Sequence, residues 1–251
     1  WTAVASEAQP VRSIEITDSE LHAGIRPPLL TYANDTGGGE PASWILPGGV
    51  LLAELVEKSR ATPGITFVTP SAAATGYKDG PNDAHVQLAD GRSLTARLVV
   101  AAEGRKSTLR EAAGIKLVGW PYRQTGIVVT LAHERPHDGV AVQHFLPAGP
   151  FAILPLTGNR SCITWSEDAR EARRILALDD AGFLAEIDKR FGGKLGAVTL
   201  AGPRASWPLE MHLARAYAAP RLALIGDTAH GVHPIAGQGL NLGLRAVAAL
   251  A

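Results

Sequence analysis

The chain has 251 residues, of which 46% are hydrophobic, and 24 Lys and Arg balance 24 Asp and Glu. This length can bury a sizeable core in one large or two smaller domains. The zero net charge argues against a nucleic-acid-binding surface. A single cysteine, Cys162, excludes an internal disulfide framework or a multi-cysteine metal site and fits a cytoplasmic protein. No apolar run is long enough to cross a bilayer.

The first half of the chain mixes strands and helices. Helical spacing of apolar residues predicts a helix over Val50–Arg60, and Leu109–Ala113 is predicted as a short helix ending at Gly114. The continuous apolar run Leu98–Ala102 is typical of a buried parallel strand. Further strands are predicted at Ile14–Thr17, Leu29–Tyr32 and Ile65–Val68, with a hairpin formed by Ala84–Leu88 and Ser93–Leu98 around Asp90-Gly91.

The pattern changes in the second half. Four closely spaced strands without intervening helices predict an antiparallel sheet: Ile127–Leu131, Val140–Phe145, Ala152–Pro155 and Ser161–Trp165. A helix over Asp179–Phe191, a buried strand over Leu222–Ile225 and a helix over Gly239–Leu250 follow. The alternation of helices and strands is therefore interrupted by an antiparallel block.

The segment from Leu222 to Leu244 carries most of the chemical information. It is predicted as a strand, a sharp loop and a helix, with Asp227 just beyond the carboxyl end of the strand, where open α/β sheets bind ligands. A carboxylate at this place can accept hydrogen bonds from sugar-like hydroxyls. Gly237 and Gly239 let the backbone approach a flat ligand, and the helix N-terminus favours negative charge. The simpler interpretation is a glycine-rich turn with Asp227 as a helix cap.

A second acidic-glycine turn follows the strand at Leu98–Ala102. Glu103-Gly104 stands directly after that strand and before the helix at Leu109. An ordinary acidic turn explains this segment equally well when it is taken alone. Its pairing with the Gly226-Asp227 segment favours a functional role for it.

Together these segments resemble a known family. Gly226-Asp227-Thr228-Ala229-His230, followed by the run from His233 to Gly243, is similar to the signature of the ubiquinone-biosynthesis hydroxylases. These belong to the single-component FAD monooxygenases that include p-hydroxybenzoate hydroxylase. Glu103-Gly104 with Ser107 and Arg110 resembles the Asp-Gly motif of the same enzymes. Weaker likenesses lie at 144–156 and 207–215.

The resemblance implies an α/β (α+β) fold, in which an incomplete, three-layer Rossmann-like FAD-binding domain carries an inserted antiparallel-sheet substrate domain. The substrate domain would comprise residues 1–40 and 119–217, and the FAD-binding domain residues 41–118 and 218–251. Asp227 would bind the ribityl or pyrophosphate region of FAD, and Glu103 and Gly104 would lie near the pyrophosphate. The remaining implied cofactor residues are Gly226, Pro234, Gly237, Gln238, Gly239, Leu240, Asn241 and Arg110.

The implied reaction is hydroxylation of an aromatic ring by O₂, with FAD as cofactor and NAD(P)H as electron donor. The implied substrate is a polyprenylated phenol of ubiquinone biosynthesis. The resemblance also implies a cytoplasmic protein associated peripherally with the inner membrane or with a biosynthetic complex. The flavin carries the chemistry in such enzymes, so no residue is assigned as a catalytic acid or base.

The chain departs from the family pattern in two informative ways. It lacks the family's opening strand, G-x-G-x-x-G turn and helix, and Gly48-Gly49 replaces the usual Asn-Arg before the helix at Val50. Both ends have the pattern of an interrupted helix, so we expect a chain cut at both ends. We therefore expect weak or absent FAD binding by these 251 residues alone.

Three alternatives remain. His230 and His233 have the spacing of a metal-binding pair, but no third ligand is evident, and a metal is not predicted. A flavin-fold enzyme could act on a different aromatic substrate. A non-catalytic flavin-fold scaffold would also explain the missing ADP-binding motif.

Overall fold

The computed structural model describes residues 1–21, 23, 26–68, 70 and 72–251. The chain divides into two compact units. Unit 1 comprises residues 1–66 and 123–208, and unit 2 comprises residues 67–122 and 209–251. These boundaries differ from the expected ones mainly because residues 41–66 belong to unit 1. The long strands β9 (Leu117–His133) and β14 (Ala205–Ala214) continue from one unit into the other.

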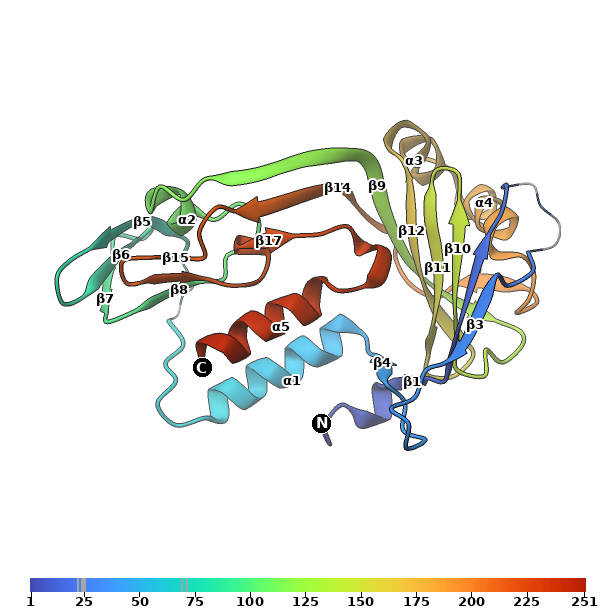
Figure 1. Ribbon diagram of the computed structural model, residues 1–251, viewed down its shortest axis with the longest axis horizontal. Coiled ribbons are helices and arrows are strands. Elements are labelled where there is room, and N and C mark those ends of the chain that lie inside the picture. The colour runs from blue at the N-terminus through green and yellow to red at the C-terminus, as the bar shows by residue number, and fades with distance from the viewer. Residues whose placement is uncertain (22, 24–25, 69, 71) are drawn as a thin grey trace. The chain divides into compact units, whose positions relative to one another are not determined.

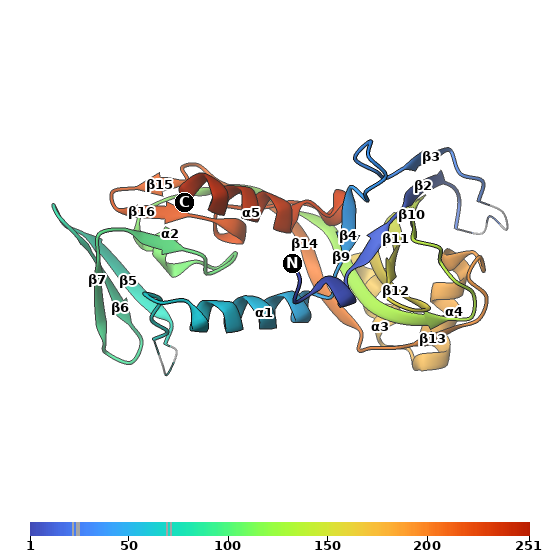
Figure 2. The same cartoon turned by 90° about the horizontal axis from the view of Figure 1, so that it is seen from below.

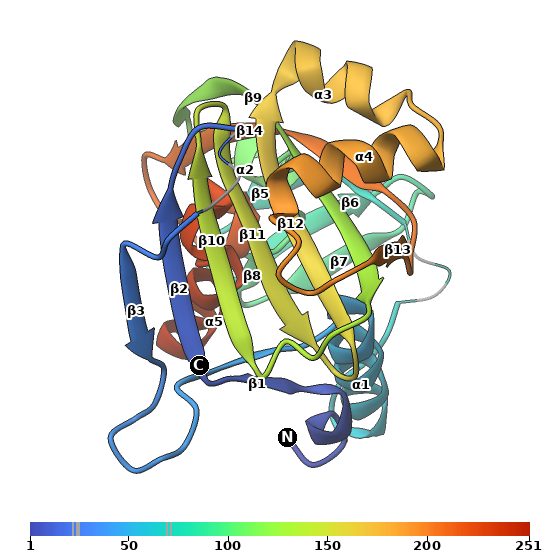
Figure 3. The same ribbon diagram turned by 90° about the vertical axis from the view of Figure 1, so that its right-hand side faces the viewer.

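A large mixed sheet dominates unit 1 (Figure 3). Its strands in unit 1 follow the order β9-β12-β11-β10-β2-β3. The predicted antiparallel block is confirmed: β9, β12, β11 and β10 pair antiparallel along their lengths. The strand β2 then joins β10 in parallel. The bounds are β2 Ser13–Asp18, β3 Leu30–Ala33, β10 Val140–Leu146, β11 Gly149–Leu156 and β12 Arg160–Asp168, with β13 (Val198–Leu200) beside β9.

Two helices cover one face of this sheet, as Figure 3 shows. They are α3 (Ala169–Leu176) and the predicted helix α4 (Asp180–Phe191), whose Asp179 caps the N-terminus by accepting from the backbone N–H of Gly182. Alternate strand residues such as Ile127 and Ile163 are fully buried against helical residues such as Phe183. Burying one such side chain contributes about 1.5–3 kcal/mol. The period-2 alternation of the strands therefore places the core of unit 1 on the α3–α4 side.

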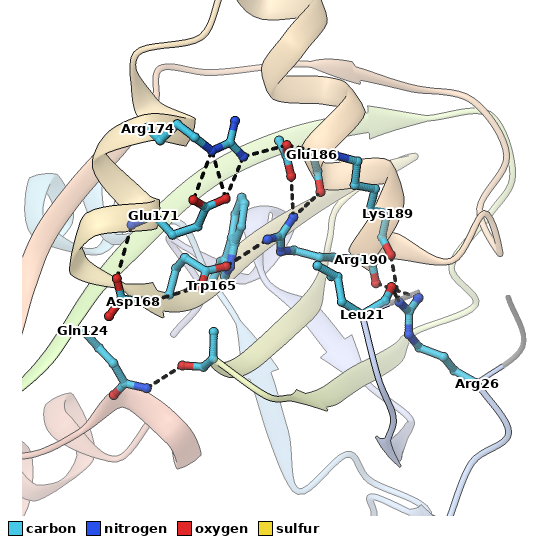
Figure 4. Close-up of polar contacts among 12 residues, drawn as sticks. Leu21, Arg26, Gln124, Trp165, Asp168, Glu171, Arg174, Glu186, Lys189 and Arg190 are labelled. Carbon is cyan, nitrogen blue, oxygen red and sulfur yellow. Dashed lines mark hydrogen bonds and ion pairs between the residues drawn. The ribbon is translucent and has the colours of Figure 1, made fainter. Parts of the chain in front are cut away.

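A network of charged side chains is buried beside Trp165 (Figure 4). Arg190 is only 3% exposed and bonds Glu167 at 2.9 Å and Glu186 at 3.0 Å. Its guanidinium lies 4.2 Å from the Trp165 ring centroid. Burial would raise the pKa of Glu186, but hydrogen bonds from Arg174, Lys189 and Arg190 outweigh it and lower that pKa to about 2. The network thus favours the ionised form of Glu186 inside the unit.

A second polar group, His144, is buried on the same side of the sheet. Its side chain is 6% exposed, and its Nδ1 lies 2.6 Å from Thr17 Oγ1 on the neighbouring strand β2. Burial, together with the charges of Arg26 and Lys194, lowers the pKa of His144 to about 4, with burial as the largest cause and Glu15 opposing the shift. The imidazole is therefore neutral in the folded protein at neutral pH.

This buried imidazole predicts a pH-dependent stability. Unfolded His144 would titrate near pH 6.5 and folded His144 near pH 4. Between these values the unfolded chain binds the extra proton, so stability is full above pH 6.5 and falls toward pH 4, by up to about 3 kcal/mol. Urea unfolding at pH 7.5 and pH 5 should show this loss for the protein. His144→Gln should lose clearly less over the same interval, and an equal loss in both would contradict the assignment.

The remaining elements of unit 1 lie outside the large sheet. The strands β1 (Gln9–Val11) and β4 (Ser43–Ile45) pair antiparallel, after a short 3-10 turn at Ala5–Glu7. The predicted helix at Val50 is confirmed as α1 (Gly48–Ala61), which begins at the two glycines that precede it.

Unit 2 contains the predicted parallel strands. β8 (Val99–Ala101) pairs in parallel with β16 (Leu222–Leu224), and β15 (Ala218–Ala219) completes this sheet (Figure 1). The predicted hairpin is confirmed as β6 (Ala84–Leu88) and β7 (Ser93–Ala96), joined by β5 (Ala74–Asp79) in a separate sheet (Figure 2). The helices are α2 (Thr108–Ala112), which packs against β5, and α5 (Gly239–Leu250), which has the bounds expected from the sequence.

One predicted element is wrong. Ile65–Val68 is not a strand: the Ile65 N–H donates to Thr62 O in a turn, and the apolar side chains of Ile65, Phe67 and Val68 are exposed. Apolar and β-branched composition does not make a strand where no neighbouring strand pairs with it. Conversely, β14 was not predicted from the sequence, and it contains Pro208, a residue that is rare inside strands. Among the described residues, no helix is long and apolar enough to cross a membrane.

Candidate functional site

The two acidic-glycine turns of the sequence meet in unit 2. Each follows one of the parallel strands β8 and β16, so both lie at the same edge of the sheet. The Ile225 N–H donates to Ala101 O at 3.1 Å and extends this pairing beyond the strands. Thr228 Oγ1 then accepts from the Gly104 N–H at 3.0 Å and donates to Gly104 O at 3.2 Å. The sheet register and this threonine join the two motifs into one site.

Glu103 and Arg110 stabilise the turn between β8 and α2. Glu103 Oε2 accepts hydrogen bonds from the Ser107 hydroxyl and, at 3.1 Å, from the Leu109 N–H. Arg110 is 3% exposed and donates to Arg105 O at 2.8 Å and Thr228 O at 3.2 Å. Both predicted cofactor residues thus hold the backbone of the paired turns.

Asp227 presents its carboxylate at the surface of unit 2. Its side chain is 54% exposed, and Arg105 Nε lies 3.9 Å from Asp227 Oδ2. The same arginine lies 3.5 Å from Glu210 on β14. Asp227 O is held by buried His212, whose Nε2–H donates to it at 2.8 Å. The backbone is thereby fixed while the carboxylate stays accessible to a ligand.

The loop after Asp227 leaves open space along the backbone. Gly226 and Gly237 adopt left-handed conformations, with φ of +58° and +60°. A Cβ built on Gly237 or Gly239 would meet no protein atom within 4 Å. Gly239 begins α5, and the N-cap residue Gln238 forms no side-chain capping bond with the first turn. The loop therefore presents an uncapped helix N-terminus beside a glycine-lined surface, which suits an anionic, flat ligand.

The other predicted residues lie along the same loop. Pro234 opens the short 3-10 helix Pro234–Ala236, and His233 Nδ1 accepts from the Ile235 N–H at 3.2 Å. Gln238, Leu240 and Asn241 are exposed at the beginning of α5. His230 has both ring nitrogens buried without a hydrogen-bond partner. Among the described residues, no group of three His, Cys, Asp or Glu is arranged to hold a metal ion.

Three further residues shape the site without having been predicted as site residues from the sequence: Thr228, His212 and Gly231. Thr228 bonds a residue 124 positions away, and that pairing has no local sequence signal. A Cβ on Gly231 would lie 2.3 Å from His212 Cε1, so a glycine is needed for the histidine to reach Asp227. The need for a glycine at position 231 follows only from the pairing of β14 with β17 (His230–Gly231), which brings His212 against it.

Paired parallel strands, an accessible carboxylate and a glycine-lined helix N-terminus define a cofactor-binding α/β protein. The chain belongs to the FAD binding domain family, whose model matches residues 43–251.

The curated relatives agree with this assignment. Over the whole chain, 43% of residues are identical to the ubiquinone hydroxylase UbiL of Rhodospirillum rubrum and 33% to the 3-demethoxyubiquinol 3-hydroxylase of Escherichia coli. The chain spans 57% and 62% of the lengths of these two relatives.

Solved structures show the same fold. The probable FAD-dependent monooxygenase pqsL of Pseudomonas aeruginosa matches 96% of this chain and 67% of its own, with a TM-score of 0.78 and 22% identity. HpxO of Klebsiella pneumoniae, solved with FAD and uric acid, matches 98% of this chain and 64% of its own, with a TM-score of 0.71 and 18% identity.

The residues present fit the riboflavin part of FAD. The open surface at Gly237 and Gly239 leaves room for a flat ring where any side chain would intrude. The uncapped α5 N-terminus suits the negative charge of a reduced flavin, and the exposed Asp227 carboxylate suits hydroxyl groups.

Proposed function

We propose that this chain is part of an FAD- and NAD(P)H-dependent monooxygenase that hydroxylates an aromatic ring, namely a polyprenylated phenol in ubiquinone biosynthesis. The observation that carries the proposal is the joined pair of turns with the glycine-lined α5 N-terminus, in a chain of the FAD binding domain family. The names of the UbiL and 3-demethoxyubiquinol 3-hydroxylase relatives support the substrate class.

In this proposal the residues of unit 2 bind and orient the cofactor. Asp227 accepts hydrogen bonds from the ribityl region. Pro234, Gln238, Leu240 and Asn241 line the ring beside Gly237 and Gly239, and the α5 N-terminus stabilises negative charge on it. Glu103 and Arg110 position the backbone near the pyrophosphate. The bound flavin supplies electron transfer from NAD(P)H and the activation of O₂.

The substrate surface is proposed on the face of the large sheet opposite α3 and α4. The register aligns Gln143, Ala152, Thr164 and Val128 in one row across the strands, and Leu154, Cys162 and Thr130 in the next. These side chains are uncharged, and all except Ala152 are half-buried. An uncharged face with a few hydroxyl and amide groups suits a phenol ring with an apolar tail. A polyprenyl tail would bring the enzyme to a membrane surface.

The deciding experiment measures flavin binding and ¹⁸O transfer. FAD is titrated into the purified chain, and bound flavin is followed by its absorbance at about 370 and about 450 nm. The loaded protein is then supplied with NAD(P)H, a prenylated phenol and ¹⁸O₂. A product carrying one ¹⁸O atom supports the proposal. Flavin binding without labelled product from this or other phenols favours the scaffold alternative. Weak binding agrees with the missing ADP-binding motif, whereas no saturable binding even at millimolar FAD overturns the flavin role of this chain.

Asp227 should contribute strongly to flavin affinity. Replacing its carboxylate in Asp227→Ala removes acceptors of charge-assisted hydrogen bonds, each worth about 1.5–3 kcal/mol. The flavin Kd should therefore rise at least about tenfold. Glu210→Ala is the matched control, because Glu210 is the other carboxylate beside Arg105. Fluorescence titration should find its Kd close to that of the unchanged protein, and equal losses in both variants would argue for a general charge effect.

A further inference from the structure

Unit 1 contains a cavity of about 270 Å³ on the α4 side of the sheet. Its inner wall is formed by buried residues of β10, β11 and the end of α4, among them Val142, Ile153 and Phe191. Val142 and Ile153 are direct partners across β10 and β11 and point to the side opposite the proposed substrate face. The cavity is therefore a separate site from that face.

The charged groups at its rim already have partners. Lys194 Nζ bonds the two Glu15 oxygens at 2.7 and 2.6 Å. Arg26 donates to Ser19 Oγ at 3.0 Å and to the carbonyl oxygens of Leu21 and Lys189 at 2.9 and 2.7 Å (Figure 4 shows the two carbonyl contacts). Each cation is thus neutralised or satisfied by protein atoms. An ionic ligand would have to displace one of these bonds, so the cavity favours a neutral occupant.

The two histidines that line the cavity differ in whether a ring nitrogen remains able to bond a ligand. Both ring nitrogens of His137 have partners, Leu156 O at 2.7 Å and the Gly139 N–H at 3.0 Å. His144 uses Nδ1 for Thr17, which leaves Nε2 as the ring atom able to bond an occupant. The Thr17 hydroxyl can either donate to Nδ1 or accept from it. When Nδ1 accepts, Nε2 carries the proton and donates, and when Nδ1 donates, Nε2 accepts. A ligand hydroxyl pairs with Nε2 in either tautomer, because it too can donate or accept.

The size of the cavity limits the ligand. Apolar cavities of about 150 Å³ already admit benzene. A cavity of about 270 Å³ whose inner wall is apolar accommodates one ring with small substituents. We propose that this cavity binds a neutral single-ring phenol, with its ring against Val142, Ile153 and Phe191 and its hydroxyl on His144 Nε2. This site lies on the sheet face opposite the proposed substrate surface and requires no flavin.

The test uses phenol as the probe and the complete chain without added flavin. With ¹³C/¹⁵N-histidine labelling, phenol should shift the His144 imidazole resonances saturably. Benzoate, which carries a charge, should bind at least about tenfold more weakly. His144→Leu should weaken phenol binding about three- to tenfold, as expected for one lost hydrogen bond, with binding of this variant read by calorimetry. Val142→Phe, which fills the cavity, should abolish the His144 shift.

The control is Thr130→Val on the opposite face of the sheet, which should leave the His144 shift and its midpoint unchanged. Thermal unfolding verifies that each variant is folded, and His144→Leu carries the test if Val142→Phe is not. Unmoved His144 resonances at millimolar phenol would overturn the proposal, as would equal affinity for benzoate. Because flavin is absent, these outcomes are independent of the flavin titration that tests the proposed function.

Discussion

Replacing Arg190 by methionine is expected to destabilise unit 1 by about 3–5 kcal/mol, the cost of breaking a buried ion pair by removing one partner. Arg190 is 3% exposed and is the cation between Glu167 and Glu186. Without it, Glu167 remains as a buried carboxylate, 4% exposed, that has lost its ion-pair partner. The loss of the cation–π contact with Trp165 adds to the effect. Urea unfolding followed by Trp fluorescence measures the change.

Arg174→Met provides the matched control for this prediction. Arg174 contacts the same Glu186 at 2.8 Å, but its side chain is 48% exposed. Solvent-exposed pairs of this kind contribute about 0–1 kcal/mol. A loss for Arg174→Met as large as that for Arg190→Met would show that burial does not decide the energetics of this network.

The second large effect concerns flavin affinity without loss of folding. Gly239→Val adds a side chain where no protein atom lies within 4 Å of the Cβ position, and valine has a higher helix propensity than glycine. The thermal midpoint should be unchanged or higher. If the flavin ring lies against Gly239, overlap with the new methyl groups costs about 1–3 kcal/mol, which lowers affinity about ten- to hundredfold.

Gly38→Val is the control, because Gly38 is equally open and has no positive φ. It lies in the loop before β4, far along the sequence from the flavin-type motifs. Flavin titration of both variants, together with their melting curves, separates a binding defect from a folding defect. Unchanged flavin affinity in Gly239→Val would remove Gly239 from the proposed ring surface.

The sequence predicted those helices and strands whose own residues carry a clear local pattern. α5 has helical spacing and a glycine start, and β10 to β12 have alternating residues between turns, so both were predicted correctly. Ile65–Val68 failed because a strand depends on a partner that its own residues do not specify. The strand β14 was not predicted because Pro208 weakens the local strand signal, and its pairing with β17 depends on residues elsewhere in the chain.

In the candidate site, too, residues with a local sequence signal were predicted, and those defined by long-range contacts were not. Asp227 and Gly239 could be proposed from the motif, and the structure places them at one strand–loop–helix segment. The buried position of Arg110 and the Thr228–Gly104 bonds depend on contacts across more than a hundred residues. The cavity around His144 was not predicted either, because it arises from the parallel pairing of β2 with β10.

The reciprocal bonds between Gly104 and Thr228 also bear on how the protein folds. They join residues 124 positions apart, so closing this loop costs conformational entropy. That cost is lower once the intervening strands are ordered, so we expect these bonds to form late. Contacts of such sequence separation slow folding and form with the parallel pair β8–β16. A partly folded chain could contain complete hairpins and helices and still lack the site. Acquisition of a flavin-type site would then report the last stage of assembly of unit 2, after its local structure has formed.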